Sequence, residues 1–156
     1  MKRALQICAV ILLAMAAVGL ASAQGDPFVG TWKLDVAKSK FDPGPAPMSQ
    51  SRTWEASGKV SVEGVSASGK PVAYAYTVKS DSQEYPVTGA IANGADKVST
   101  KKIDSNTVQA NFTRAGKHVE TATFTASMGG KVLTIHAVGM TPDGKPFENM
   151  AVWSKQ

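Results

Sequence analysis

The chain has 156 residues, a formal net charge of +5, a hydrophobic fraction of 43% and a charged fraction of 19%. This length and composition suit one globular domain, and they exclude a large multidomain assembly and wholesale disorder. The sequence contains one apolar run that approaches the length of a membrane span, and that run lies at the N-terminus.

Residues 1–23 have the order of a cleavable signal peptide. Lys2 and Arg3 precede an apolar stretch from Ile7 to Leu20, and small residues follow up to Ala23. An uncleaved anchor would need about 20 apolar residues, so we expect cleavage after Ala23. The predicted product is a secreted or periplasmic domain, residues 24–156, that has no stable membrane insertion.

The composition of this mature domain limits its chemistry. Cys8 lies within the expected signal peptide, so the mature chain has no cysteine for disulfides, thiolate nucleophiles or cysteine-based zinc sites. Removal of Lys2 and Arg3 leaves a net charge of +3. That charge is too small to indicate a nucleic-acid partner.

The first part of the mature domain predicts one strand and an irregular connection. Residues 29–35 alternate as a strand, and residues 36–41 are interpreted as one helical turn. The segment from Asp42 to Pro47 reads Asp-Pro-Gly-Pro-Ala-Pro. Proline fits neither a helix interior nor a central strand, so this segment predicts an extended connection to the second strand.

The rest of the chain predicts a meander of short strands. Val72, Tyr74 and Tyr76 share one face of a strand, while Ala73 and Ala75 share the other. Gly-Lys pairs recur between the apolar runs, where tight hairpins require glycine. The ten expected strands lie at residues 29–35, 49–56, 59–67, 71–79, 84–90, 96–103, 107–114, 117–126, 131–140 and 146–154.

This arrangement indicates an all-β fold, an antiparallel up-and-down β-barrel of 8–10 strands. The gaps between strands have hairpin length and leave no room for parallel crossover connections. Closure into a barrel is favoured over an open sandwich because it removes exposed strand edges.

The opening of the mature chain resembles that of the calycin superfamily, the lipocalins and fatty-acid-binding proteins. The resemblance rests on Gly30-Thr31-Trp32, and the following Ala-Lys-Ser-Lys-Phe also looks like small exported bacterial proteins described as lipocalin-like. It implies that Gly30 and Trp32 begin the first strand and that Trp32 closes the barrel floor against a basic residue, for which Lys155 is the expected partner by position. Fatty-acid-binding proteins hold the ligand carboxylate with an Arg-x-Tyr pair in the last strand. Ala151-Val152-Trp153 stands there, so the resemblance implies the fold and argues against fatty-acid binding.

Aromatic residues on the predicted strands supply candidates for a ligand pocket. Tyr74 and Tyr76 lie beside alanines, a combination that packs poorly as a tight core, and we expect them to line a cavity together with Phe112 and Trp153. The alternative, that these side chains only fill a solid core, stays open. The two arginines of the mature chain, Arg52 and Arg114, are interpreted as outward, solvated charges, although an inward arginine would suit an anionic ligand.

No residue pattern indicates a metal, a cofactor or a reaction. His118 and Glu120 share one strand face by alternation, but two ligands are fewer than the three or four that zinc requires. The sequence has no Gly-x-Ser-x-Gly elbow, and no pair of catalytic carboxylates can be identified. We therefore expect no catalytic residues, no metal site and no cofactor.

The favoured hypothesis is an exported, non-catalytic, lipocalin-like protein that binds a small apolar or amphipathic ligand. Two alternatives remain open. One is a structural, interaction or inhibitor protein of the cell envelope with a packed barrel, and the other is a barrel enzyme.

Overall fold

The structure is a computed structural model that describes residues 25–127 and 129–156. The expected signal peptide, residues 1–23, and its cleavage site lie outside the described residues. Across the described ranges every regular element is a β-strand, and no helix has the length and apolar character needed to cross a membrane.

The described residues form eleven strands. They are β1 (Gly30–Asp42), β2 (Ser49–Trp54), β3 (Lys59–Val65), β4 (Pro71–Thr77), β5 (Asp81–Pro86), β6 (Thr88–Gly89), β7 (Lys97–Asp104), β8 (Thr107–Arg114), β9 (Lys117–Ala126), β10 (Val132–Met140) and β11 (Pro146–Lys155).

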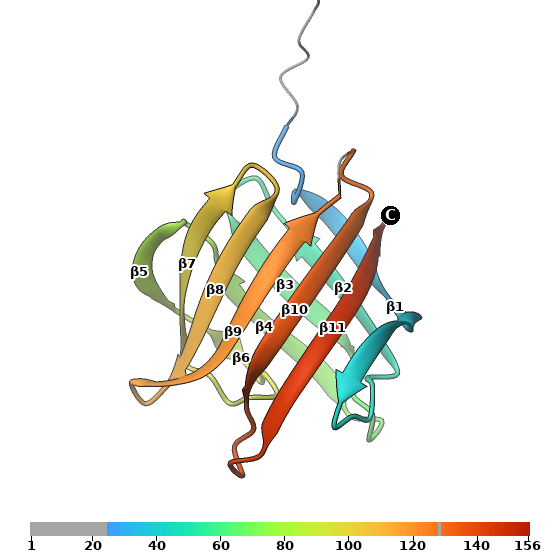
Figure 1. Ribbon diagram of the computed structural model, residues 1–156, viewed down its shortest axis with the longest axis vertical. Helices are drawn as coiled ribbons and strands as arrows, with labels where there is room; N and C mark the ends of the chain where they lie inside the picture. The colour runs from blue at the N-terminus through green and yellow to red at the C-terminus, as the bar shows by residue number, and fades with distance from the viewer. Residues whose placement is uncertain (1–24, 128) are drawn as a thin grey trace, which may run out of the picture.

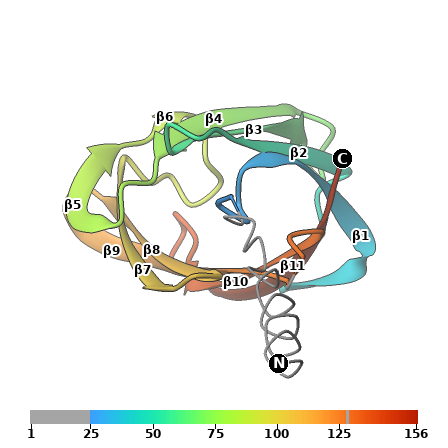
Figure 2. The same cartoon turned by 90° about the horizontal axis from the view of Figure 1, so that it is seen from above.

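The strands form one antiparallel sheet that curls into a nearly closed barrel (Figures 1 and 2). The order around the sheet is β5-β7-β8-β9-β10-β11-β1-β2-β3-β4-β6. The last strand, β11, pairs with β1, so Trp32 lies opposite Lys155. This result confirms the predicted all-β antiparallel barrel, with eleven strands instead of eight to ten.

The additional strand arises where the sequence predicts a single strand over residues 84–90. The segment divides into β5 and β6, which pair with different neighbours, β7 and β4. Val87 lies between them and donates its backbone N–H to Asp96 O at 2.8 Å. The alternation of the sequence continues across this change of partner, and residues 84–90 were therefore predicted as a single strand.

The helical turn predicted for residues 36–41 is wrong, because β1 continues to Asp42. A β-bulge lies between Asp35 and Lys40 in the pairing with β11. Within it, Asp35 Oδ1 accepts a hydrogen bond from the Lys38 N–H at 3.2 Å, and the Ser39 hydroxyl donates to Asp35 O at 2.6 Å. These short-range bonds resemble a helical turn, but the strand pairing resumes at Lys40.

The end of the barrel where β1 begins is closed by aromatic side chains. Trp32 is fully buried, and its Nε1–H donates to Phe28 O at 2.8 Å. The Phe28 ring stacks on Trp54 with centroids 4.9 Å apart. Lys155 Nζ lies 5.0 Å from the Trp32 ring centroid, so the expected basic partner is in place.

Gly30 allows this closure. Its φ is +139°, and a Cβ at this position would lie 2.5 Å from Cε of Lys155. Glycine therefore lets the lysine cross the start of β1 and reach the Trp32 ring.

Candidate functional site

A cavity of about 600 Å³ lies inside the barrel, between the aromatic floor and the other end of the barrel. Its volume is in the range of small-molecule sites. Strands β1, β2, β4 and β8–β11 contribute to its wall, and the proline-rich residues 42–47 lie at its mouth. The predicted extended connection after the first strand therefore borders the cavity.

Alanines on three adjacent strands create much of this space. Ala122 on β9 lies opposite Ala137 on β10, and Ala151 on β11 lies opposite Ile135. All three alanines are buried and line the cavity. Because their side chains are short, the inward face of these strands leaves room that larger residues would fill.

Arg52 lies at the inner end of the cavity. It is 5% exposed, and its Nη1–H donates to the Tyr76 hydroxyl at 2.7 Å. Its guanidinium carbon lies 5.4 Å from the Phe124 ring centroid and 5.1 Å from that of Trp153. The expectation that Arg52 points outward is therefore wrong: it is on the same face of β2 as the buried Trp54.

Arg52 takes part in no salt bridge with the described residues, although Glu120 is close enough for the Arg52 charge to lower its pKa. Among the described residues, no carboxylate oxygen lies within 4.0 Å of its guanidinium nitrogens. Its Nε and the indole Nε1 of Trp153 are buried donors without a hydrogen-bond partner in the described part of the chain. A buried unsatisfied donor costs about 1–3 kcal/mol, so this arrangement weakens the fold.

Tyr74 and Tyr76 extend the polar end of the cavity. Their rings are nearly parallel, at 12°, with centroids 6.4 Å apart. Burial raises the pKa of Tyr74 to about 12, an effect that the positive charge of Arg52 partly offsets. Burial also raises the pKa of Tyr76. Both side chains therefore present neutral hydroxyl groups at ordinary pH.

Glu120 on β9 also lines the cavity, and it is held by a loop. Asn93 donates a short hydrogen bond from Nδ2 to the Glu120 carboxylate. Burial raises the pKa of Glu120 to about 7, although the bond from Asn93 and the charge of Arg52 act in the opposite direction. The carboxyl group therefore changes its charge near neutral pH.

The loop that carries Asn93 connects β6 to β7 and runs inside the ring of strands (Figure 2). Asn93 is 4% exposed, and its Oδ1 accepts the Ala95 N–H at 2.9 Å. Arg114 Nη1 donates to Asn93 O at 3.0 Å. Arg114 is thus partly buried and binds the backbone, contrary to the expectation of a fully solvated charge.

The four candidate residues from the sequence lie around this one cavity. Tyr74 and Tyr76 come from β4, Phe112 from β8 and Trp153 from β11. Phe112 meets Tyr76 edge-on, with centroids 5.5 Å apart. The structure thus brings the four together, and their binding of a ligand stays a prediction.

Sequence reasoning missed three polar residues of the cavity: Arg52, Glu120 and Asn93. Alternation could have found two of them. Arg52 is two residues before the buried Trp54, and Glu120 is two residues before the buried Ala122. Asn93 lies in an irregular loop, so no periodic pattern could place it.

The described residues contain no cluster of three His, Asp or Glu side chains that could hold a metal ion. Alternation had suggested that His118 and Glu120 share one face of their strand, but in the structure they do not. A β-bulge separates them, because Phe112 lies opposite Glu120 and Thr113 opposite His118. His118 bonds to the Thr121 hydroxyl at 2.9 Å, and His136 bonds to Glu148 at 2.9 Å.

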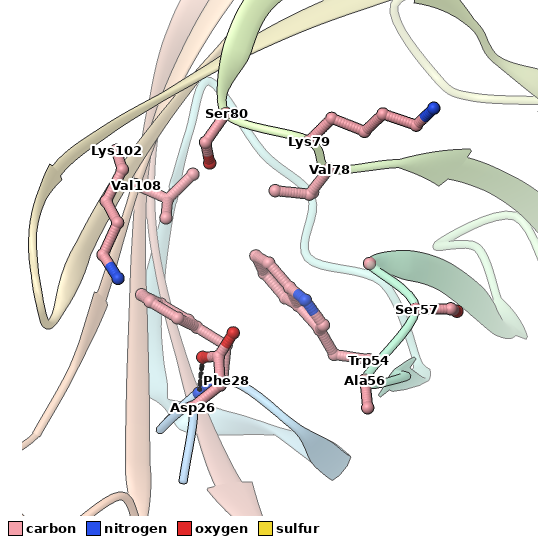
Figure 3. Close-up of a pocket in the computed structure, with 11 residues that line it drawn as sticks. Asp26, Phe28, Trp54, Ala56, Ser57, Val78, Lys79, Ser80, Lys102 and Val108 are labelled. Carbon is pink, nitrogen blue, oxygen red and sulfur yellow. Dashed lines mark hydrogen bonds between the residues drawn. The ribbon is translucent and has the colours of Figure 1, made fainter.

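A smaller hollow of about 230 Å³ lies at the floor end of the barrel (Figure 3). Phe28 and Trp54 form one side of it and separate it from the larger cavity. Figure 3 shows that Lys79 points away from this hollow, while Lys102 extends toward Phe28. Five of its eleven lining residues are polar or charged, but the hollow is less than half the volume of the larger cavity, which is therefore the better candidate site.

No protein-family model matches the chain, and no curated protein sequence matches it.

Proposed function

We propose that this protein is an exported, lipocalin-like carrier that binds a small amphipathic molecule in its barrel. The observation that carries the proposal is the cavity of about 600 Å³, which has apolar walls and a polar inner end. Phe112, Phe124, Ile135 and Phe147 supply apolar surface, and Arg52 with Tyr76 supplies hydrogen bonds. Such a division suits a ligand with one polar end.

The barrel topology and the Gly30-x-Trp32 opening support membership of the calycin superfamily. Trp32 lies at the barrel floor, and Lys155 from the last strand covers its ring. The signal-like order of residues 1–23 supports export to the periplasm or beyond. In this proposal the mature protein meets its ligand outside the cytoplasm.

The cavity also favours a carrier over a structural protein with a packed barrel. A structural barrel gains stability from filling its interior, and each deleted methylene in a core weakens the fold. Here Ala122, Ala137 and Ala151 keep the interior open. Open space beside an unpaired buried charge is better explained by a ligand than by packing.

A test of the carrier proposal is titration with N-phenyl-1-naphthylamine, a neutral apolar dye whose fluorescence rises on leaving water. We expect saturable binding with one site per barrel. Ala137→Phe, which fills the cavity, should weaken binding about tenfold or more, since changes of one or more methylenes in an apolar site have effects of this size.

Val138→Phe is the matched control for this substitution. Val138 is the next residue on β10, and its side chain is 39% exposed on the outer face. Binding by this variant should equal that of the wild type. Equal binding by Ala137→Phe, or no saturable binding by the wild type, would remove the support for a carrier.

Glu120 favours a second candidate function, acid–base catalysis. A general base works best when its pKa is near the operating pH, and burial raises the pKa of Glu120 to about 7. Its hydrogen-bond partner, however, is the non-ionisable Asn93. Mass spectrometry of a bound molecule after long incubation separates the two functions, because a carrier returns the molecule unchanged and an enzyme does not.

A further inference from the structure

We propose that the inner end of the cavity receives the anionic group of its ligand, so that the ligand class is an amphipathic monoanion held by Arg52. The polar group would be a carboxylate, a sulfonate or a similar oxyanion. This inference rests on the proposed carrier function and specifies the chemistry of its ligand.

The first argument is the unmatched charge of Arg52. Buried charges in proteins are normally paired, because an isolated charge loses its hydration without compensation. Arg52 is 5% exposed and makes a hydrogen bond to the neutral hydroxyl of Tyr76. The aromatic rings of Phe124 and Trp153 compensate only part of its charge. An anion in the cavity would supply the missing countercharge.

The second argument is the kind of polar atom found beside Arg52. Arg52 Nε and Trp153 Nε1 are both donors that lack an acceptor among the described residues. The Tyr76 hydroxyl accepts a bond from Arg52, so its own proton remains available to another group. Donors that lack acceptors beside Arg52 match the lone pairs of an oxyanion, whereas the positive charge of Arg52 would repel a cationic group.

Glu120 is the internal carboxylate that faces this region, and it is bound elsewhere. Its carboxylate accepts the hydrogen bond from Asn93 on the β6–β7 loop and forms no salt bridge with Arg52. Asp42 and Lys70, which carry opposite charges, also border the cavity, and both are exposed. Arg52 is therefore the buried cation of the cavity, and the apolar body of the ligand would extend from it toward Phe147 and the proline-rich segment.

The test compares two dyes with the same ring skeleton. 8-Anilinonaphthalene-1-sulfonate carries a sulfonate, whereas N-phenyl-1-naphthylamine is neutral. We expect the purified protein to bind the sulfonate about tenfold or more tightly, the gain that a charge-assisted hydrogen bond gives. Dodecanoate should likewise displace the bound dye at lower concentration than dodecanol does.

Arg52→Gln shows whether Arg52 causes this preference. The substitution should abolish the advantage of the sulfonate over the neutral dye and of dodecanoate over dodecanol. Lys101→Gln is the matched control, because it removes one positive charge from an exposed position on β7. That variant should keep the preference of the wild type.

The outcomes separate the two proposals. If the neutral dye and the sulfonate bind equally well to the wild type, the anion site is wrong while the carrier function stands. If Lys101→Gln lowers the preference as much as Arg52→Gln does, surface charge explains it and the anion site is also wrong. If neither dye binds, both proposals fail. Should Arg52→Gln not fold, the dodecanoate and dodecanol comparison on the wild type decides alone.

Discussion

Lys155 Nζ lies over the ring of Trp32, 5.0 Å from its centroid, and joins the last strand of the barrel to the first. The two residues are direct neighbours in the pairing of β1 with β11. Barrel closure is therefore supported by a backbone ladder and by a side-chain contact at the same position.

Truncation of Trp32 should strongly destabilise the protein. Trp32 is fully buried and hydrogen-bonded to Phe28 O, so Trp32→Ala should lower the free energy of unfolding by about 3–5 kcal/mol. Urea unfolding followed by circular dichroism measures this loss. Val36→Ala on the same strand, where the side chain is 38% exposed, should have little effect. A melting temperature for Trp32→Ala close to that of the wild type would show that the floor does not depend on this ring.

Gly30→Ala should destabilise the protein for two reasons, an unfavourable backbone conformation and a steric conflict with Lys155. The φ of +139° disfavours alanine, and the new Cβ would lie 2.5 Å from Cε of Lys155. We expect a loss of about 1 kcal/mol or more in the free energy of unfolding. In a Lys155→Ala background the steric conflict is absent, so the loss should be smaller. The same loss in both backgrounds would assign the whole effect to the backbone.

Arg52→Met should leave the fold at least as stable as the wild type. Replacing a buried charge that lacks a salt bridge by an apolar side chain of similar length removes the cost of desolvating the charge, and this gain offsets the loss of the hydrogen bond to Tyr76. Arg114→Met is the contrasting variant, because it removes the 3.0 Å bond to Asn93 O and should cost about 1–3 kcal/mol. Denaturant unfolding measures the free energy of unfolding of both variants, and Arg52→Met should be the more stable of the two. A large loss for Arg52→Met would mean that Arg52 serves the fold.

Glu120 should make stability depend on pH. Its folded-state pKa is raised from 4.5 to about 7, so between these values the unfolded chain has released a proton that the folded chain retains. The free energy of unfolding should therefore fall as pH rises through this range, by roughly 3 kcal/mol, and level off above pH of about 7.

Glu120→Gln should remove this fall, because the amide does not ionise. Unfolding at a series of pH values from about 4 to 8 measures it. Glu63→Gln, at an exposed position on β3, should retain the pH dependence of the wild type. If Glu120→Gln kept the dependence, another group would be responsible.

Local periodicity explains what the sequence could predict of this fold. Alternation located the strands, whereas the meeting of Trp32 with Lys155 was implied by the resemblance of the Gly30-Thr31-Trp32 opening. The error at residues 36–41 arose because the Asp35–Ser39 bonds are local, whereas the pairing of Lys40 with Met150 joins distant parts of the chain. Sequence spacing can indicate local hydrogen bonds, but it does not show which distant segments of the chain pair.

The candidate site also contains residues that local periodicity could place and residues that it could not. Tyr74, Tyr76, Phe112 and Trp153 could be placed together because strand alternation assigns each of them to a face. Arg52 was assigned to solvent on the general behaviour of charged residues, although its position before Trp54 indicated the interior. The contact of Asn93 with Glu120 depends on the path of an irregular loop, which only the folded chain defines.

The loop that carries Asn93 has a consequence for what the barrel can enclose. The sheet ends at β5 on one side and at β6 on the other. The Asn93 side chain binds Glu120 on β9, and Arg114 on β8 donates to the Asn93 backbone oxygen, so these bonds help to hold the loop that follows β6. Displacing this loop would break these bonds and uncover the buried Ala95, but residues 90–96 belong to no strand of the sheet. We therefore expect a bulkier molecule to be accommodated by movement of this loop before any paired strands separate.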